Sequence, residues 1–202
     1  FEKDLEKYDK VVFATGAKGI KHGWSMLRPE KWNKKEVLEG AGLKHVFSYT
    51  EIFDENLIIP ENVILFDTMG SRQSAVCAEY LAEKGASVNF VTQLSHPYPD
   101  LASSRDWGKT HKMLKLKKVK YFTDRELVKI EKDFVVIRDL YTKKCDKIGN
   151  IGMVVLIQGN VSENKLYNTI RKYKDSYIIG DAVAGRRVND AIMEGELIGR
   201  KI

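Results

Sequence analysis

The sequence predicts an α/β fold: a parallel sheet covered by helices, with an antiparallel β-meander in its second half. Two short apolar runs, residues 62–66 and 87–91, are bounded by turn residues, which is typical of strands buried on both faces. Between them, residues 71–84 place apolar side chains on one helical face and end at Gly85, a favoured helix C-cap. Strand, tight turn, helix, glycine and strand form a βαβ unit of about 30 residues with a right-handed crossover.

The other elements follow from the same patterns. Residues 10–14 and 153–157 are further apolar runs and are predicted as buried strands, the second of which closes the sheet. Residues 19–60 are predicted to form an irregular connection with one or two short helices. Beyond the βαβ unit we expect a helix at 105–117, a strand at 119–122, a meander at 126–131, 134–139 and about 141–147, a strand at 177–179 and a helix at 189–201.

Charge and hydropathy narrow the class of protein. The chain of 202 residues has a net charge of +6, and its densest basic stretch, residues 109–120, interleaves lysines with apolar residues and lacks a ladder of aromatic side chains. We therefore expect a solvated lysine face and no nucleic-acid binding. No apolar run approaches the about 18 residues that a membrane span requires, and no secretory signal opens the chain. We expect no membrane insertion.

Neither a redox disulfide nor a metal site is predicted. Cys77 and Cys145 are far apart and form no C-x-x-C pair, and Cys77 lies in an apolar helical stretch as a small buried residue. This low cysteine content fits a reducing cytosol, so a cytoplasmic location is expected. The four histidines are scattered without metal-ligand spacing. No general acid, base or nucleophile stands out, and we assign no catalytic residue.

The turn between the first strand and helix of the βαβ unit is the first candidate site. In a dinucleotide-binding domain this turn needs small residues, because the backbone approaches a pyrophosphate that binds the free N–H groups of the helix start. Of the G-x-G-x-x-G pattern only Gly70 is present, and Asp67 stands where the first glycine would be. We expect a Rossmann-like domain with an open turn, and its candidate cofactor-binding residues are Asp67, Gly70, Ser71, Arg72 and Gln73.

The end of the second strand would contact the ribose of a bound nucleotide. A carboxylate there would favour NAD over NADP, but the sequence at this place is Val91-Thr92-Gln93. Thr92 is therefore a candidate contact, and NAD, NADP or a plain adenosine nucleotide all remain possible ligands. The alternative is a Rossmann-like scaffold that has lost ligand binding.

Motifs near the two ends of the chain predict part of a second, FAD-type dinucleotide-binding domain. Strand 11–14 ends in the small turn of residues 14–16, and Gly159 follows strand 153–157 in a similar turn. Near the C-terminus a strand leads into Gly180 and Asp181, and a helix begins near Asp190. Gly180 lets a cofactor chain pass against the backbone, and Asp181 can accept a hydrogen bond from a ribityl hydroxyl. The alternative is a Gly-Asp turn that only caps the next segment.

The order of these motifs resembles the C-terminal half of the family of trimethylamine dehydrogenase, dimethylamine dehydrogenase and 2,4-dienoyl-CoA reductase. The resemblance rests on residues 8–17, 62–73, 78–85, 88–92 and 177–195. It implies that Gly70–Gln73 begin the helix of an NAD(P)-type domain. It also implies an FAD or ADP site lined by Ala14, Thr15, Gly16, Gly180 and Asp181, with Asp190 and Ala191 at a helix start.

The resemblance also implies what lies outside this chain. Members of the family carry an upstream TIM barrel with FMN and a four-iron cluster, followed by a first FAD-binding βαβ segment. None of these is present here, and we expect a fragment that needs an upstream barrel domain or subunit and is inactive alone. Amine dehydrogenases of the family hold ADP in place of a working FAD, and the turn from Asp67 to Gly70 resembles that branch.

We therefore expect three segments and a function in electron transfer. Residues 1–60 would form the later part of an FAD-type domain and its connection, residues 61–160 a Rossmann-like NAD(P)- or ADP-binding domain, and residues 161–202 the return to the FAD-type domain. The predicted function is a nucleotide-binding, electron-transfer module of an FAD/NAD(P)-dependent oxidoreductase. The alternative is a non-catalytic domain that binds ADP structurally or serves assembly.

Overall fold

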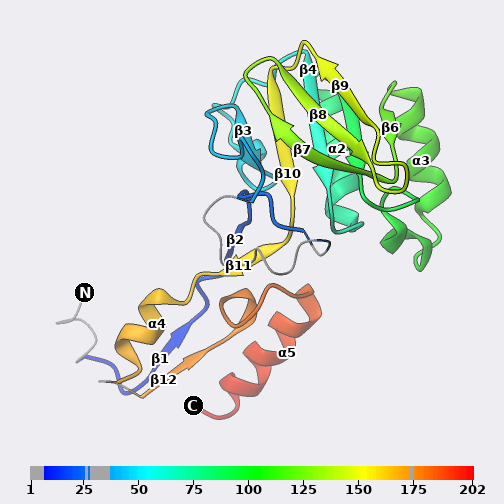
Figure 1. Cartoon of the computed structure of the whole chain (residues 1–202). Helices are drawn as coiled ribbons and strands as arrows, with labels where there is room; N and C mark the ends of the chain where they lie inside the picture. The colour runs from blue at the N-terminus through cyan, green and yellow to red at the C-terminus, as the bar shows by residue number, and fades with distance from the viewer. Residues whose placement is uncertain (1–6, 26, 28–36, 173–174) are drawn as a thin grey trace. The chain divides into compact units, whose positions relative to one another are not determined.

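A computed structural model describes residues 7–25, 27, 37–172 and 175–202 (Figure 1). The contacts divide the chain into two compact units. The central unit comprises Ile20–Gln158, and the terminal unit combines Phe1–Gly19 with Gly159–Ile202. Residues 20–60, which the sequence pattern groups with the first segment, thus belong to the central unit.

The central unit is built on a parallel sheet that confirms the predicted fold class. Among the described residues its five strands follow the order β3 (Val46–Ser48), β10 (Met153–Ile157), β4 (Asn62–Asp67), β5 (Ser87–Thr92) and β6 (Lys120–Phe122). The prediction that β10 closes the sheet is wrong, because β3 pairs along its outer edge. Three residues are too short to show a period, so β3 was not distinguishable from irregular chain.

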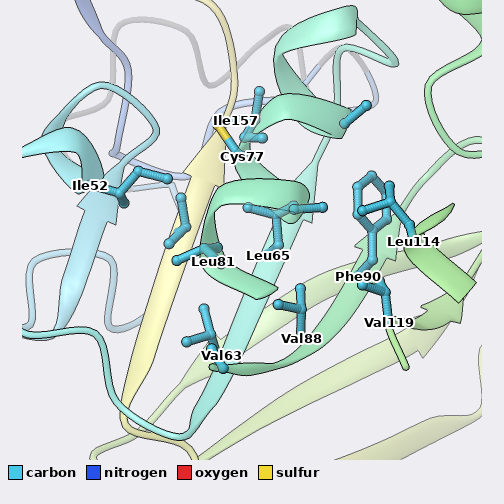
Figure 2. Packing of buried hydrophobic residues seen from close by; sticks show 14 of the residues in the cluster. Ile52, Val63, Leu65, Cys77, Leu81, Val88, Phe90, Leu114, Val119 and Ile157 are labelled. Carbon is cyan, nitrogen blue, oxygen red and sulfur yellow. The ribbon is translucent and has the colours of Figure 1, made fainter. Parts of the chain in front are cut away.

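Two of the described helices cover one face of this sheet. They are α2 (Arg72–Glu83) and α3 (Trp107–Leu116), with short 3₁₀ turns η2 (Glu51–Phe53) and η3 (Pro99–Ala102) beside them. Figure 2 shows side chains of the sheet meeting those of the helices in one apolar cluster. Its fully buried members include Ile52, Val63, Leu65, Ala78, Leu81, Phe90, Leu114 and Val155.

The antiparallel meander covers the other face, as Figure 1 shows. It consists of β7 (Arg125–Ile130), β8 (Phe134–Asp139) and β9 (Cys145–Gly149). The last strand begins later than the predicted position near residue 141, because the Asp139 carboxylate accepts the N–H groups of two residues of the following turn, 141 and 142. A second cluster joins the two layers through Ile64, Phe66, Val91, Val154 and Leu156 of the sheet and Leu127, Ile130, Val135 and Ile137 of the meander.

The described part of the terminal unit contains two small pairs of strands and two α-helices. Among its described residues, β1 (Val11–Phe13) runs parallel to β12 (Ser176–Ile178), while β2 (Ala17–Gly19) pairs antiparallel with β11 (Asn160–Ser162). The helical segments are α4 (Lys165–Ile170), η4 (Gly180–Ala182) and α5 (Val188–Gly199). The pair β2–β11 and helix α4 were not predicted. In neither unit does a described helix combine the length and apolar character that crossing a membrane requires.

Candidate functional site

The terminal unit brings two of the predicted turns to one sheet edge. Because β1 and β12 are parallel neighbours, the turns that follow them leave the sheet on the same side. The Ile179 N–H donates to the Phe13 carbonyl oxygen at 3.0 Å and extends the pairing to the point where the turns begin. Residues 14–16 and Gly180–Asp181 therefore lie side by side.

The backbone of both turns is accessible at its glycines. Gly16 has a φ of +72°, and a Cβ atom added there would meet nothing within 4 Å. Gly180 has a φ of +65°, and its added Cβ would meet only the Ala191 Cβ, at an ordinary contact distance of 3.5 Å. A positive φ accounts for glycine at both positions. Among the described residues, the space beside the Gly16 Cα is open and that beside the Gly180 Cα holds only Ala191 in ordinary contact, which leaves room for a ligand next to these Cα atoms.

A charged pair that sequence reasoning missed holds the second turn. The Glu194 carboxylate accepts the Gly180 N–H at 2.7 Å and the Arg186 guanidinium at 2.6 Å. These contacts lower the pKa of Glu194 below its usual range, and the hydrogen bond from Arg186 has a larger effect than the one from the Gly180 N–H. The Asp181 carboxylate accepts the Arg186 backbone N–H at 3.1 Å. Glu194 comes from α5, one turn beyond the expected site, and only the fold brings it to the loop.

The remaining predicted residues of this unit support the same turns. Asp190 in the first turn of α5 accepts the Arg187 N–H at 3.1 Å and so caps the helix. The Thr15 hydroxyl donates to the Glu163 carbonyl oxygen, which ties the turn after β1 to the chain near α4. Gly159 has a φ of +88° and precedes β11.

In the central unit, Asp67 is buried inside the turn that follows β4. Its side chain is 0% exposed, and Oδ1 accepts the N–H groups of Met69 at 2.9 Å and of Gly70 at 3.0 Å. Oδ2 lies 3.1 Å from the same Gly70 nitrogen. Burial raises the pKa of the Asp67 carboxyl above its ordinary value, while these N–H donors act in the opposite direction. The N–H groups of Met69 and Gly70 are thus used within the protein.

Residues 94–105, here named the covering segment, lie over this turn. An added Cβ on Gly70 would lie 2.4 Å from Leu94 Cδ1 and 2.9 Å from Pro99 Cδ. The Asp100 N–H also donates to the Gly70 carbonyl oxygen at 3.1 Å. The expectation of an open turn at Gly70 is therefore wrong, because side chains of the same chain occupy the approach to its backbone.

Two further predicted residues hold the covering segment. Thr92, fully buried, accepts the Leu94 N–H on its hydroxyl at 3.2 Å. The Arg72 guanidinium donates to the Ser104 hydroxyl at 2.9 Å and to the Asp106 carboxylate at 3.3 Å. Ser71 precedes α2 without a side-chain capping bond. Gln73 is exposed beside a pocket of about 200 Å³ whose other lining residues are Tyr49, Phe53, Arg72, Val76 and Cys77.

Tyr98 anchors the covering segment in the interior. Its ring is 0% exposed and its φ of +41° is left-handed. The Tyr98 hydroxyl lies 3.0 Å from His111 Nδ1 and 2.8 Å from the Tyr121 hydroxyl. Trp107 stacks on His111 with 4.9 Å between ring centres and donates its indole N–H to the Pro97 carbonyl oxygen. Burial raises the pKa of both tyrosines and lowers that of His111.

The two groups of predicted residues thus differ in access. In the terminal unit Ala14, Thr15, Gly16, Gly180 and Asp181 gather at one accessible edge. In the central unit the predicted residues also gather, but the structure uses them to close the turn. Within the part of the chain that the structure describes, no group of three or more His, Cys, Asp or Glu side chains has a metal-binding arrangement.

The fold resembles segments of known oxidoreductases. No family model and no curated protein matches the sequence. The structure of 6-hydroxypseudooxynicotine amine oxidase from Pseudomonas geniculata N1 is 25% identical over 98% of this chain, with a TM-score of 0.87. Histamine dehydrogenase from Rhizobium sp. 4-9 is 22% identical over 98%, with a TM-score of 0.85, and a 2-naphthoyl-CoA reductase complex is 23% identical over 96%, with a TM-score of 0.77.

The similarity covers only part of each of these proteins. The chain spans 30% of the amine oxidase, 31% of the histamine dehydrogenase and 27% of the reductase. It therefore has the fold of a module that makes up about a third of a larger oxidoreductase chain.

Proposed function

We propose that this chain is a nucleotide-binding, electron-transfer module of a flavin-dependent oxidoreductase, and that its terminal unit holds FAD or ADP. The observation that carries the proposal is the pair of accessible glycine turns, at Gly16 and Gly180, at the carboxyl edge of parallel strands. Ligands of α/β proteins bind at this edge. The likeness of nearly the whole chain to an amine oxidase and a histamine dehydrogenase supports the same function.

Each residue at this edge has a chemical role toward a nucleotide. The backbone at residues 14–16 and at Gly180 offers a surface against which a phosphate–ribose chain can lie. Asp181 accepts a hydrogen bond from a ribose or ribityl hydroxyl, and Glu194 with Arg186 keeps the Gly180 turn in place. A bound flavin supplies the redox chemistry, and the protein positions it.

The terminal unit has the surface of an incomplete domain. Among the described residues, β1 and β12 form a sheet of only two strands, although parallel sheets are normally covered on both faces. Helix α5 has no buried residue, and Val188, Ile192 and Leu197 are more than half exposed. We propose that further strands of a larger oxidoreductase complete this unit and its nucleotide site. Substrate oxidation would take place outside the present chain, which is inactive alone.

The nucleotide can be identified directly. Mass spectrometry of small molecules released by denaturing the freshly purified native protein is expected to detect FAD or ADP. A protein that releases neither, and does not bind ADP in calorimetry, would contradict the proposal. Oxidation of an amine by the isolated 202-residue chain would contradict its assignment as a dependent module.

Asp181 gives a site-specific test with a matched control. Asp181→Ala removes a charged hydrogen-bond acceptor and is expected to weaken nucleotide binding about tenfold or more. Asp175→Ala changes an aspartate that lies exposed at the opposite end of β12 and is expected to leave the affinity unchanged. Equal affinities of the two variants would show that Asp181 does not contact the nucleotide.

A further inference from the structure

We infer that Asp67 and the covering segment exclude dinucleotides from the central unit, so that Asp67 determines which nucleotides the module accepts. The inference deepens the proposed function, since it restricts the module to the nucleotide site of the terminal unit. It means that a nicotinamide dinucleotide is not held at the turn between β4 and α2.

The first argument concerns the N–H groups of the turn. A dinucleotide-binding turn holds a pyrophosphate through free backbone N–H groups at the helix start. Here the Asp67 carboxylate accepts the N–H groups of Met69 and Gly70, in the turn just before α2, at 2.9–3.1 Å. The carboxylate thus stands in for the phosphate oxygens. A phosphate would lose these donors and would meet a like charge, which is costly in a buried place.

The second argument is steric. Gly70 should allow the cofactor to approach the backbone, but Leu94 and Pro99 fill that space so tightly that not even a Cβ fits. A pyrophosphate is far larger than a methyl group. Binding would therefore require both Leu94 and the Pro99 ring to move, and the ring can move only together with its backbone.

The third argument is that several independent contacts hold the covering segment down. Its start is tied to Thr92, its middle to the Gly70 carbonyl oxygen through the Asp100 N–H, and its end to Arg72. The buried Tyr98 adds hydrogen bonds to two aromatic side chains. Together these hydrogen bonds hold the covering segment over the turn, since each of them must break before the segment can leave.

The test follows individual backbone amides in ¹H–¹⁵N correlation spectra of the full chain. On titration with NADPH or NADH in large excess, the signals of Met69, Gly70 and Ser71 are expected to stay in place. A saturable shift of these signals would overturn the inference. ADP is titrated separately, and shifts at Gly16 and Gly180 report on the proposed function. A failure there leaves the result for the central turn unaffected.

A variant that opens the turn tests the cause of exclusion. Asp67→Gly combined with Leu94→Ala and Pro99→Ala removes the carboxylate and both covering side chains, and NADPH is then expected to shift the Gly70 signal saturably. A folded variant without this shift would overturn the role assigned to these residues. If the variant does not fold, the wild-type titration decides alone.

Asp54→Gly is the matched control. Asp54 is exposed, follows η2, and also accepts a backbone N–H two residues on, from Asn56 at 2.9 Å. This variant is expected to show no response to NADPH.

Discussion

Asp67→Ala should destabilise the central unit measurably. The substitution leaves the buried Gly70 N–H without its acceptor and also removes the acceptor of the Met69 N–H. An unpaired buried donor costs about 1–3 kcal/mol, and the second, part-buried bond adds about 1 kcal/mol. Relief from burying a carboxylate offsets part of this loss. We expect the free energy of unfolding to fall by about 2–3 kcal/mol.

The assay can isolate this unit, because all three tryptophans, at positions 24, 32 and 107, fall within residues 20–158. Urea unfolding is therefore followed by tryptophan fluorescence at neutral pH. Asp67→Asn is the matched control, since its amide oxygen can still accept both N–H groups. We expect its free energy of unfolding to stay within about 1 kcal/mol of wild type.

The direction in which stability changes with pH distinguishes an effect of the Asp67 charge from an effect of packing. A carboxyl group whose folded-state pKa is raised stabilises the fold when protonated, and this contribution is lost as the pH rises through the folded-state pKa. The stability of Asp67→Asn relative to wild type should therefore increase from acidic to neutral pH. An alanine variant as stable as the asparagine variant would refute the structural role of the two hydrogen bonds.

Three further predictions use the same fluorescence assay. Tyr98→Phe keeps the buried ring but removes a hydroxyl that bonds two aromatic side chains, so stability should fall by about 1–3 kcal/mol; the exposed Tyr141→Phe should cause no change, and equal effects would disprove the anchor. Gly70→Ala should destabilise more than Gly85→Ala, because both glycines have a positive φ but only at Gly70 does a Cβ meet side chains; the reverse order would contradict the closed turn. Burial lowers the pKa of His111, and the neighbouring Lys115 lowers it further, so the free energy of unfolding should fall as the pH drops below 6.5. In His111→Gln this fall should be smaller. An equal fall in both proteins would exclude His111 as the cause of the pH dependence.

Local patterns were sufficient for the elements that carry enough residues to show a period. The apolar run at β4 and the helical face of α2 were predicted within one residue of their observed bounds. Strand β3 and helix α4 were missed, because each is short and neither forms an apolar run that ends in a glycine turn, as the equally short β1 and β12 do. Their positions depend on partners far along the chain.

In the candidate site, too, local features were predictable and contacts between distant residues were not. The glycine turns at residues 16 and 180 were predicted because a strand followed by small residues is a local signal. The part of Glu194 in holding Gly180 was not predicted, since 14 residues separate them and only α5 brings them together. Accessibility to a ligand is a property of neighbours in space, and no local signal reports it.

The sequence by itself determined a parallel α/β fold with a meander and the location of the turns that end its strands, because burial and turn formation act on residues close in the chain. Only the tertiary structure decided which of those turns is accessible. The covering segment returns from beyond β5 to fill the space over Gly70, while at Gly16 a Cβ would meet none of the described residues within 4 Å. That difference arises from long-range packing and from one buried carboxylate, Asp67, that satisfies the N–H groups a phosphate would need.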